Sequence, residues 1–383
     1  MFRLTFLGTS AGIPTKQRNV TALAIECVNT HLSGDKKNSK LARPWVLVDC
    51  GEGTQHQLLR TKLSGHQLAA ICITHVHGDH CYGLPGLLAS LAMSGRQSKL
   101  VIIAPKAIAA LLDTLSLTTE LYFSYPIEFI AIEEVLAGTH QSELIQDGKV
   151  IVDFGRGHQL SVSMTALSHR VASHAFILEQ SLSFNKLNTD KLRAEGVAAG
   201  KTWGLLQSGQ DVVLEASELA KPNEDSGGFK QESPQHLKSA DYVDAVSVTT
   251  KMVVAGDNDS PELLRMAVEG ASVLVHEATY TDAVLQKIDA RVEDNTDGLV
   301  IDPMHSSAGQ VARFAEQVSL PNLILTHFSA RYQLYDDEKS KSPNMANIRL
   351  EVEQYYQGNC WLAEDFAQFE VGDEVTRVVN NDA

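Results

Sequence analysis

The sequence lacks the features of a membrane or secreted protein. None of its apolar runs approaches the roughly 20 residues that a helix needs to span a bilayer. Its first residues, Met1–Gly8, alternate apolar and polar side chains, whereas a signal peptide has a long apolar core. The five cysteines are scattered and form no C-x-x-C pair, which excludes a disulfide framework and favours small buried side chains. We therefore expect a reduced, cytoplasmic protein with no membrane contact.

Positive charge is also scarce. The chain has 32 Lys and Arg against 47 Asp and Glu, so its formal net charge is -15. This excess of negative charge disfavours a polyanionic partner such as nucleic acid. An acidic protein still binds nucleic acid where positive charge is focused locally or supplied by metal ions. A nucleic-acid substrate would therefore require a local basic surface or a metal centre.

Short apolar runs, rich in Val, Ile and Leu, recur along the chain and end in polar residues of catalytic type. The runs are Phe2–Leu7, Trp45–Val48, Ala69–Ile73, Met252–Ala255, Val273–Val275 and Leu323–Leu325. Because most do not alternate with polar residues, they predict strands covered on both faces. Helices are predicted between them, at Pro261–Glu269 and Ala308–Val318. The chain should thus be an α/β sandwich of two packed mixed sheets with helices outside.

Three polar stretches interrupt this pattern. His31–Arg43 is predicted to be a surface loop. Leu182–Lys238 has scattered glycines and is interpreted as an inserted arm with a mobile loop. Asp282–Pro303 separates two motifs and is interpreted as a further insertion. We expect a single domain over residues 1–383, with the arm and mobile loop inserted at about 182–238.

The strongest signal is the segment His75-Val76-His77-Gly78-Asp79-His80, which follows a predicted buried strand. Its three imidazoles and one carboxylate suit zinc, with manganese or iron as alternatives. A site with two metal ions would need more ligands than this one loop provides. The further ligands are expected at other strand ends, namely His169, Asp257 and His327. The simpler interpretations are a solvated histidine-rich loop and, for each isolated histidine, a structural role.

Further motifs accompany the histidine loop. They are His276-Glu277-Ala278-Thr279, His305-Ser306-Ser307 and Thr326-His327-Phe328-Ser329-Ala330-Arg331-Tyr332. With Phe6–Pro14 and Asp49–Thr54, they make most of the chain resemble the ribonuclease Z (tRNA 3′-endonuclease) branch of the metallo-β-lactamase superfamily. The histidine loop alone marks only the superfamily. The resemblance implies an αβ/βα sandwich that usually forms a homodimer.

The resemblance also implies two Zn²⁺ ions per chain, with Mn²⁺ or Fe²⁺ as alternatives. It implies seven metal ligands: His75, His77 and His169 for one ion, Asp79, His80 and His327 for the other, and Asp257 as the bridge. It implies three catalytic residues, Asp79, His305 and Glu277. A hydroxide bridging the metals would attack a phosphodiester, and His305, oriented by Glu277, would protonate the departing 3′-oxygen. The alternative for Glu277 and His305 is a structural salt bridge.

The arm departs from the resemblance. The family has a Gly-Pro-rich tip that grips the tRNA elbow, but Gly196–Gly204 contains no proline. Four basic residues of the arm are candidates for phosphate contacts, namely Lys186, Lys191, Arg193 and Lys201. The alternative is an ordinary solvated surface. Two smaller departures are His174-Ala175-Phe176, where the family commonly has an aromatic-Gly-Tyr, and His-Ser-Ser, where it has His-Ser-Thr.

Three functions remain open. The first is an endoribonuclease that removes the 3′ trailer of precursor tRNA. The second is a sister hydrolase on the same scaffold that acts on small phosphodiesters, sulfate esters or lactones, favoured by the altered arm and the net negative charge. The third is a non-catalytic binding protein, which the complete set of predicted ligands disfavours.

Overall fold

The computed structural model describes residues 1–29, 43–214, 234–293 and 303–379. They form two compact units. The larger comprises Met1–Phe154, Gln159–Gln180 and Thr250–Ala383. The smaller comprises Gly155–His158 and Ser181–Thr249.

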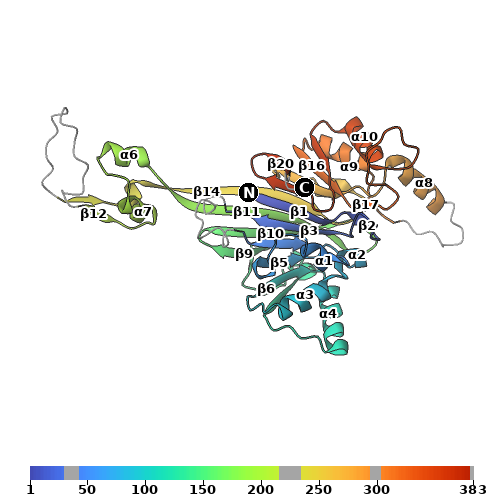
Figure 1. The fold of residues 1–383 in the computed structure, drawn as a ribbon, viewed down its shortest axis with the longest axis horizontal. Helices are drawn as coiled ribbons and strands as arrows, with labels where there is room; N and C mark the ends of the chain where they lie inside the picture. Colours follow the sequence, from blue (N-terminus) through green and yellow to red (C-terminus); the bar gives the residue numbers. More distant parts are fainter. Residues whose placement is uncertain (30–42, 215–233, 294–302, 380–383) are drawn as a thin grey trace. The chain divides into compact units, whose positions relative to one another are not determined.

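One sheet of the larger unit has the order β20-β19-β1-β3-β4-β5-β6-β7 (Figure 1). Its strands are β1 Phe2–Gly8, β3 Ala22–Cys27, β4 Trp45–Val48, β5 Leu68–Cys72, β6 Leu100–Ala104, β7 Ile127–Ala131, β19 Gln368–Val371 and β20 Val375–Val378. From β4 to β7 neighbouring strands run parallel. Strands β4, β5 and β6 are almost wholly buried, as expected for strands covered on both faces.

The second sheet has the order β18-β16-β15-β14-β11-β10-β9-β8. Its strands are β8 Ile145–Gln146, β9 Lys149–Gly155, β10 His158–Leu167, β11 Ser173–Leu187, β14 Val243–Ala255, β15 Val273–Glu277, β16 Asn322–Thr326 and β18 Asn359–Leu362. Strands β14, β15, β16 and β18 are parallel in succession. The short strands β2 Ser10–Ala11 and β17 Phe328–Ser329 pair with each other.

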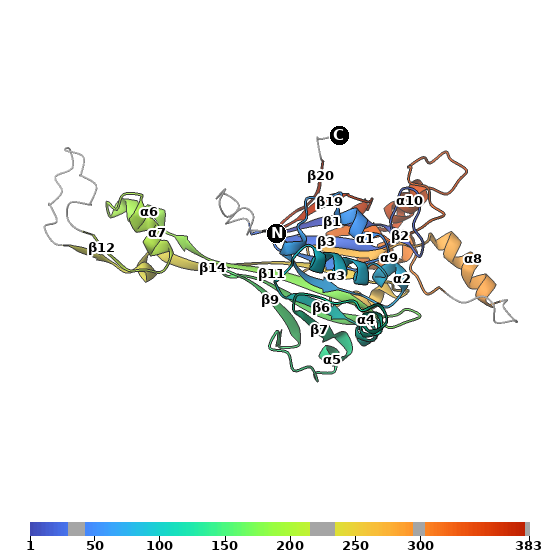
Figure 2. The same cartoon turned by 60° about the horizontal axis from the view of Figure 1, so that its bottom comes forward.

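Three apolar layers hold this unit together. The middle layer lies between the sheets and includes Phe6 of β1 and Val254 of β14. The first sheet is covered by α3 and α4 and the second by α9 and α10, as Figures 1 and 2 show. The helices are α1 Thr54–Leu58, α2 Gly78–Cys81, α3 Leu84–Met93, α4 Lys106–Thr119, α5 Ile132–Leu136, α8 Asp282–Glu293, α9 Ala308–Gln317 and α10 Met345–Tyr355. The predicted sandwich is confirmed.

Two helix predictions had different outcomes. The helix expected at Ala308–Val318 is α9, which begins with a capping box formed by Ser307 and Gln310. The α-helix expected at Pro261–Glu269 is wrong. A 3-10 helix covers only Pro261–Leu264, and turns lead from there to Gly270, where φ is 70°. Hydrogen bonds to the third preceding residue dominate its first turn, for example from Leu263 N–H to the Ser260 carbonyl.

The smaller unit is built on the extensions of β11 and β14. It contains α6 Thr189–Ala194, α7 Lys201–Gln207 and the paired strands β12 Val212–Leu214 and β13 Gln235–Leu237. It has an apolar core of its own, made of Leu192, Val197, Leu206, Leu214, Leu237 and Tyr242. Within the stretch 182–238 predicted to hold the arm and its mobile loop, residues 215–233 lie outside the described part of the chain, as does most of the predicted loop His31–Arg43.

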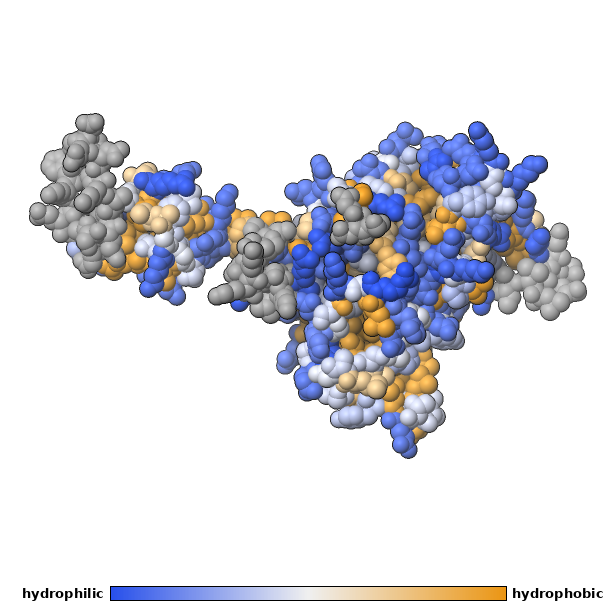
Figure 3. All heavy atoms as spheres, viewed as in Figure 1, coloured by the Kyte–Doolittle hydropathy of each residue, from blue (hydrophilic) through white to orange (hydrophobic). Residues whose placement is uncertain are grey.

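All five cysteines are free thiols, and four of them are buried, as predicted for small hydrophobic side chains. Within the described residues no helix is long and apolar enough to cross a bilayer. On the face in Figure 3, hydrophilic side chains dominate the surface over α9 and α10.

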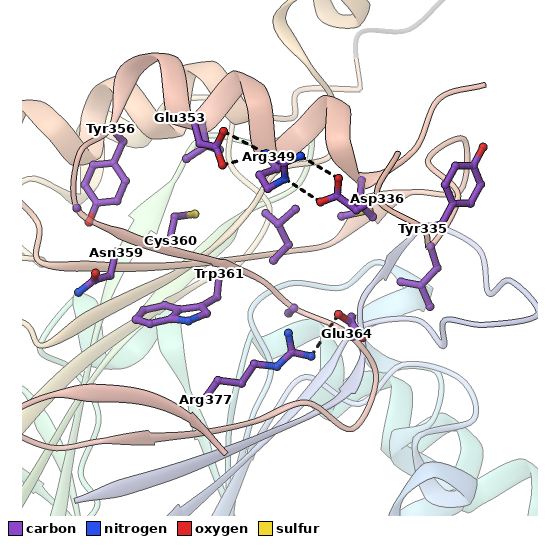
Figure 4. A pocket seen from close by; sticks show the side chains of 16 residues that line it. Tyr335, Asp336, Arg349, Glu353, Tyr356, Asn359, Cys360, Trp361, Glu364 and Arg377 are labelled. Atoms are coloured by element: carbon purple, nitrogen blue, oxygen red, sulfur yellow. Dashed lines mark hydrogen bonds and ion pairs between the residues drawn. The ribbon is translucent and has the colours of Figure 1, made fainter. Parts of the chain in front are cut away.

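A cavity of about 580 Å³ is lined by α10, β18 and β20 (Figure 4). Arg349 lies between Asp336 and Glu353, 2.8 Å and 3.1 Å from their carboxylates. Arg377 pairs with Glu364 at 3.2 Å. None of the predicted metal ligands lines this cavity, so it is distinct from the predicted site.

Candidate metal centre

The predicted metal ligands follow the carboxyl ends of strands in both sheets. His75 lies three residues after β5, Asp257 two residues after β14, and His327 one residue after β16. Because the carboxyl ends of neighbouring parallel strands meet at one edge, these side chains converge. His169 comes from the turn between β10 and β11. The structure brings all seven predicted ligands together.

Four of the ligand atoms surround one point. His75 Nε2 lies 3.2 Å from His77 Nδ1, which lies 3.1 Å from His169 Nε2. Asp257 Oδ2 is 3.6 Å from His75 Nε2 and 3.8 Å from His169 Nε2. All four atoms lie within 4.8 Å of one another. Three imidazole nitrogens and a carboxylate oxygen in this arrangement suit a divalent transition metal.

A second set of ligand atoms surrounds a neighbouring point. Asp79 Oδ2 lies 3.5 Å from His80 Nε2 and 3.3 Å from His327 Nε2, and the two nitrogens are 3.2 Å apart. Asp257 Oδ1 is 3.4 Å from each of these nitrogens. Asp257 thus presents one oxygen to each set, which is the geometry that a bridging carboxylate needs.

The outer nitrogens of two ligand histidines are held by one carboxylate, that of Asp49. His80 Nδ1 donates to Asp49 Oδ2 at 2.7 Å. Thr74 donates its hydroxyl to Asp49 and lies 3.0 Å from His75 Nδ1, so His75 Nδ1–H donates to Thr74. Protons on both Nδ1 atoms leave the Nε2 lone pairs facing the centre, as metal ligation requires.

Glu277 holds a third ligand histidine in the same way. The Thr279 hydroxyl donates to Glu277 Oε2 and accepts from His327 Nδ1 at 3.0 Å. His169 Nδ1 donates to the Met304 carbonyl at 2.8 Å. These hydrogen bonds therefore orient four of the five predicted ligand histidines for metal binding.

The electrostatics fit metal binding as well. Burial, together with the nearby His80 imidazole, holds the pKa of His75 well below its usual range, so this ring is a neutral ligand. Burial also lowers the pKa of His77. Burial opposes protonation of His80, but the carboxylates of Asp257, Asp49 and Asp79 outweigh it and raise its pKa. A metal ion would displace that proton, so binding should release protons.

Close backbone packing holds the histidine loop. Cβ atoms added at Gly51 and Gly83 would lie 2.2 Å from the Asp79 carbonyl oxygen and 2.1 Å from that of Gly51. Only glycine permits this approach between the turn after Asp49 and the loop. Gly12 N–H also donates to Asp79 Oδ2 at 2.8 Å, which positions that carboxylate.

His305 lies beside the ligands. Its Nδ1 is 2.9 Å from Glu277 Oε2 and 3.7 Å from Asp257 Oδ2. Burial disfavours its charge, yet the Glu277 and Asp257 carboxylates prevail and raise its pKa to about 9. Because Glu277 is buried and occupies Nδ1, the Nε2 of His305 remains for a substrate. A general acid requires this arrangement.

Comparison with known proteins agrees with the motifs. Ribonuclease Z of Marinobacter nauticus is 42% identical over 363 residues, which cover 94% of each chain. The chain belongs to the ribonuclease Z family. The solved structure of human tRNase Z, short form, has a TM-score of 0.52 at 20% identity and covers 97% of this chain and 99% of its own. The metallo-β-lactamase fold protein YhfI from Bacillus subtilis has a TM-score of 0.53 at 14% identity and covers 96% and 98%.

These likenesses establish the metallo-β-lactamase fold. In addition, a family model described as anti-Pycsar protein Apyc1 matches residues 2–185. That region contains the histidine loop and His169, but it ends before Asp257 and His327. The ribonuclease Z relative matches over nearly the whole chain, including the part with those residues.

Sequence reasoning missed the residues that orient the ligands. Asp49 and Thr74 directly follow the predicted strands Trp45–Val48 and Ala69–Ile73, and this position could have marked them as part of the site. His174, noted as a departure from the family, donates its Nδ1–H to the Thr74 carbonyl at 3.0 Å. Met304 offered no signal, because a backbone carbonyl is common to every residue.

Proposed function

We propose that this chain is a metal-dependent endoribonuclease that removes the 3′ trailer of precursor tRNA. The similarity to ribonuclease Z over 94% of the chain is the observation on which the proposal rests. The arrangement of His305 and Glu277 beside the two ligand sets supports it.

The seven residues of the two ligand sets would hold two Zn²⁺ ions, with Mn²⁺ or Fe²⁺ as alternatives. When bound, such ions lower the pKa of the attacking water and offset negative charge on the phosphate. Asp79 Oδ2 accepts the Gly12 N–H and also faces His80 and His327. The hydrogen bond from Gly12 therefore keeps this oxygen directed at the second ligand set.

His305 provides the proton that the departing 3′-oxygen needs. Glu277 holds its Nδ1, which leaves Nε2–H directed away from the carboxylate. Thr279 and the Asn258 backbone N–H also donate to Glu277, so the carboxylate is fixed on three sides. A fixed carboxylate keeps the imidazole oriented and favours its protonated form before transfer.

We also propose a cytoplasmic homodimer in which the smaller unit is an arm inserted in a single domain. Exposed apolar side chains support association between copies, namely Leu59 after α1, Tyr82 after α2 and Met93 at the end of α3, which are 80%, 68% and 89% exposed. Light scattering of the wild type and of Met93→Glu would test the dimer, because a buried new charge should split it.

The test of the activity compares two substrates with one enzyme preparation. A precursor tRNA with a 3′ trailer and bis(4-nitrophenyl) phosphate are each cleaved by metal-loaded wild type, and the RNA products are mapped. We expect one cut at the end of the acceptor stem and the higher kcat/KM on RNA. Turnover of the small diester without specific cleavage of RNA would favour the sister hydrolase.

A further inference from the structure

Asn258 directly follows the bridging Asp257 and is fully buried. Its side-chain Oδ1 accepts the backbone N–H groups of Ser168 at 3.3 Å and Ser260 at 3.1 Å. Its Nδ2 lies 3.2 Å from Nε2 of His276. Because the carbonyl oxygen must face the two donors, the NH₂ group must face His276, and the amide is fixed in one orientation.

The backbone of Asn258 reaches the acid pair directly. Its N–H donates to Glu277 Oε1 at 2.7 Å, and its carbonyl accepts the hydroxyl of Ser306, the residue after His305. His276 precedes Glu277 and donates its Nδ1–H to the Glu277 carbonyl at 2.8 Å. One residue thus touches both segments that hold the acid pair.

We propose that Asn258 is a positioning residue that places the His305–Glu277 pair relative to Asp257. The inference rests on the proposed function, in which His305 is the leaving-group acid. Asn258 shares a peptide unit with Asp257, so its location fixes the distance between the bridging carboxylate and the acid. Its side chain restrains rotation of that unit, because it is held by three partners, the buried His276 and the backbone N–H groups of the half-buried Ser168 and Ser260. The backbone of Ser168, which precedes the predicted ligand His169, is bonded to the same amide.

Removing the side chain leaves two part-buried N–H groups and the buried His276 Nε2 without their partner, which costs enough to loosen the segment. We expect Asn258→Ala to lower cleavage of precursor tRNA by about 10–100-fold, the usual effect of removing a group that orients a site. The loss on bis(4-nitrophenyl) phosphate should be much smaller, because nitrophenolate departs without a proton.

The decisive measurement is a double-mutant cycle on precursor tRNA with Asn258→Ala, His305→Ala and the double variant. If Asn258 acts through His305, the double variant is no slower than His305→Ala alone. Metal analysis of each variant should give the wild-type content. Ser306→Ala is the variant to use if Asn258→Ala does not fold, because it removes only the hydroxyl that donates to the Asn258 carbonyl. It should show a smaller loss with the same dependence on the substrate.

Asn344→Ala is the matched control. Asn344 is also a buried asparagine, and its Oδ1 accepts the Ala346 N–H at the start of α10. This variant should lose stability and keep the wild-type ratio of the two substrates. Three outcomes would each overturn the positioning role. Asn258→Ala could lose equal activity on both substrates, its effect on the rate could multiply with that of His305→Ala in the double variant, or it could lose bound metal. If His305→Ala itself shows no substrate dependence, the acid assignment fails, and the inference fails with it.

Discussion

Two threonines serve the same purpose in the two halves of the metal centre. Thr74 joins Asp49 to His75, and Thr279 joins Glu277 to His327. A hydroxyl donates and accepts at once, so it transmits the orientation of a carboxylate to an imidazole. At residue scale the site is thus two carboxylates, each fixing one histidine directly and another through a threonine.

The threonine link gives a prediction at this scale. Thr279→Val keeps the shape of the side chain and removes the hydroxyl, so His327 loses the acceptor that sets its tautomer. Metal affinity should fall by about 10–100-fold. Thr281→Val is the control, since Thr281 is buried two residues along and its hydroxyl contacts Tyr332 and no ligand. Competition with a chromogenic chelator measures the affinity, and equal affinities for the two variants would contradict the link.

Asp257 gives a second prediction. Asp257→Asn replaces a carboxylate that faces both ligand sets by a neutral amide, so two cations would face each other less well neutralised. We expect metal content to fall below two equivalents and turnover to be lost. Asp259→Asn changes a carboxylate outside both sets and should keep metal and activity. A fully metallated, active Asp257→Asn enzyme would refute the bridging assignment.

The sequence predicted which side chains converge at the candidate centre, but not the residues that orient them. His75, Asp257 and His327 are recognisable because each follows a buried apolar run, and strand ends converge. Asp49 has a positive φ of 60° and reaches His80 across the loop, a contact between residues 31 apart in the chain. Such contacts depend on the packing of β4 against β5, which no local pattern encodes.

At the scale of elements, strands were predicted closely where burial decides them. The run Trp45–Val48 coincides with β4. The helix at Pro261–Glu269 was wrong although its apolar residues have helical spacing. Leu264, Ala267, Val268 and Ala271 all pack on the second sheet, but their segment is one 3-10 turn followed by further turns and not an α-helix. Periodicity records which residues are buried, but not how tightly the backbone winds.

The packing of the histidine loop gives an element-scale prediction. Gly83→Ala would place a Cβ 2.1 Å from the Gly51 carbonyl oxygen, and backbone must move on one side. We expect a loss of about 1–3 kcal/mol in the free energy of unfolding, as for overpacked cores, and weaker metal binding. Gly86→Ala is the control in the same helix region, because its Cβ would meet only the end of the Gln55 side chain at 3.3 Å. Urea denaturation of both variants decides the matter.

At the scale of the whole molecule, charge is unevenly distributed along the chain. The sequence of the smaller unit holds eight basic side chains against ten acidic ones, whereas the chain as a whole has 32 against 47. Lys191 and Arg193 pack over Tyr242 and Trp203. The arm is therefore close to neutral, and the rest of the chain carries most of the net charge of -15.

The structure also shows how to remove the arm cleanly. The core of the smaller unit includes Leu214, Leu237 and Tyr242, so deleting only its helices would expose apolar side chains. The hydroxyls of Ser183 and Ser247 lie 3.4 Å apart on the extensions of β11 and β14. Replacing residues 184–246 by Asn-Gly, which favours a two-residue hairpin turn, should therefore close the two strands.

This arm-less variant should raise the Michaelis constant for precursor tRNA and leave bis(4-nitrophenyl) phosphate turnover nearly unchanged, because the arm would contact phosphates of the RNA that the small diester lacks. Each lost phosphate contact also reduces the dependence of affinity on salt by about one unit of logarithmic slope. The double variant Lys186→Ala, Lys201→Ala is the milder test, since both side chains are exposed. Kinetics at two salt concentrations measure both the change in the Michaelis constant and the change in its dependence on salt. Precursor tRNA cleavage that ignores both the deletion and the salt would mean that the arm does not bind tRNA.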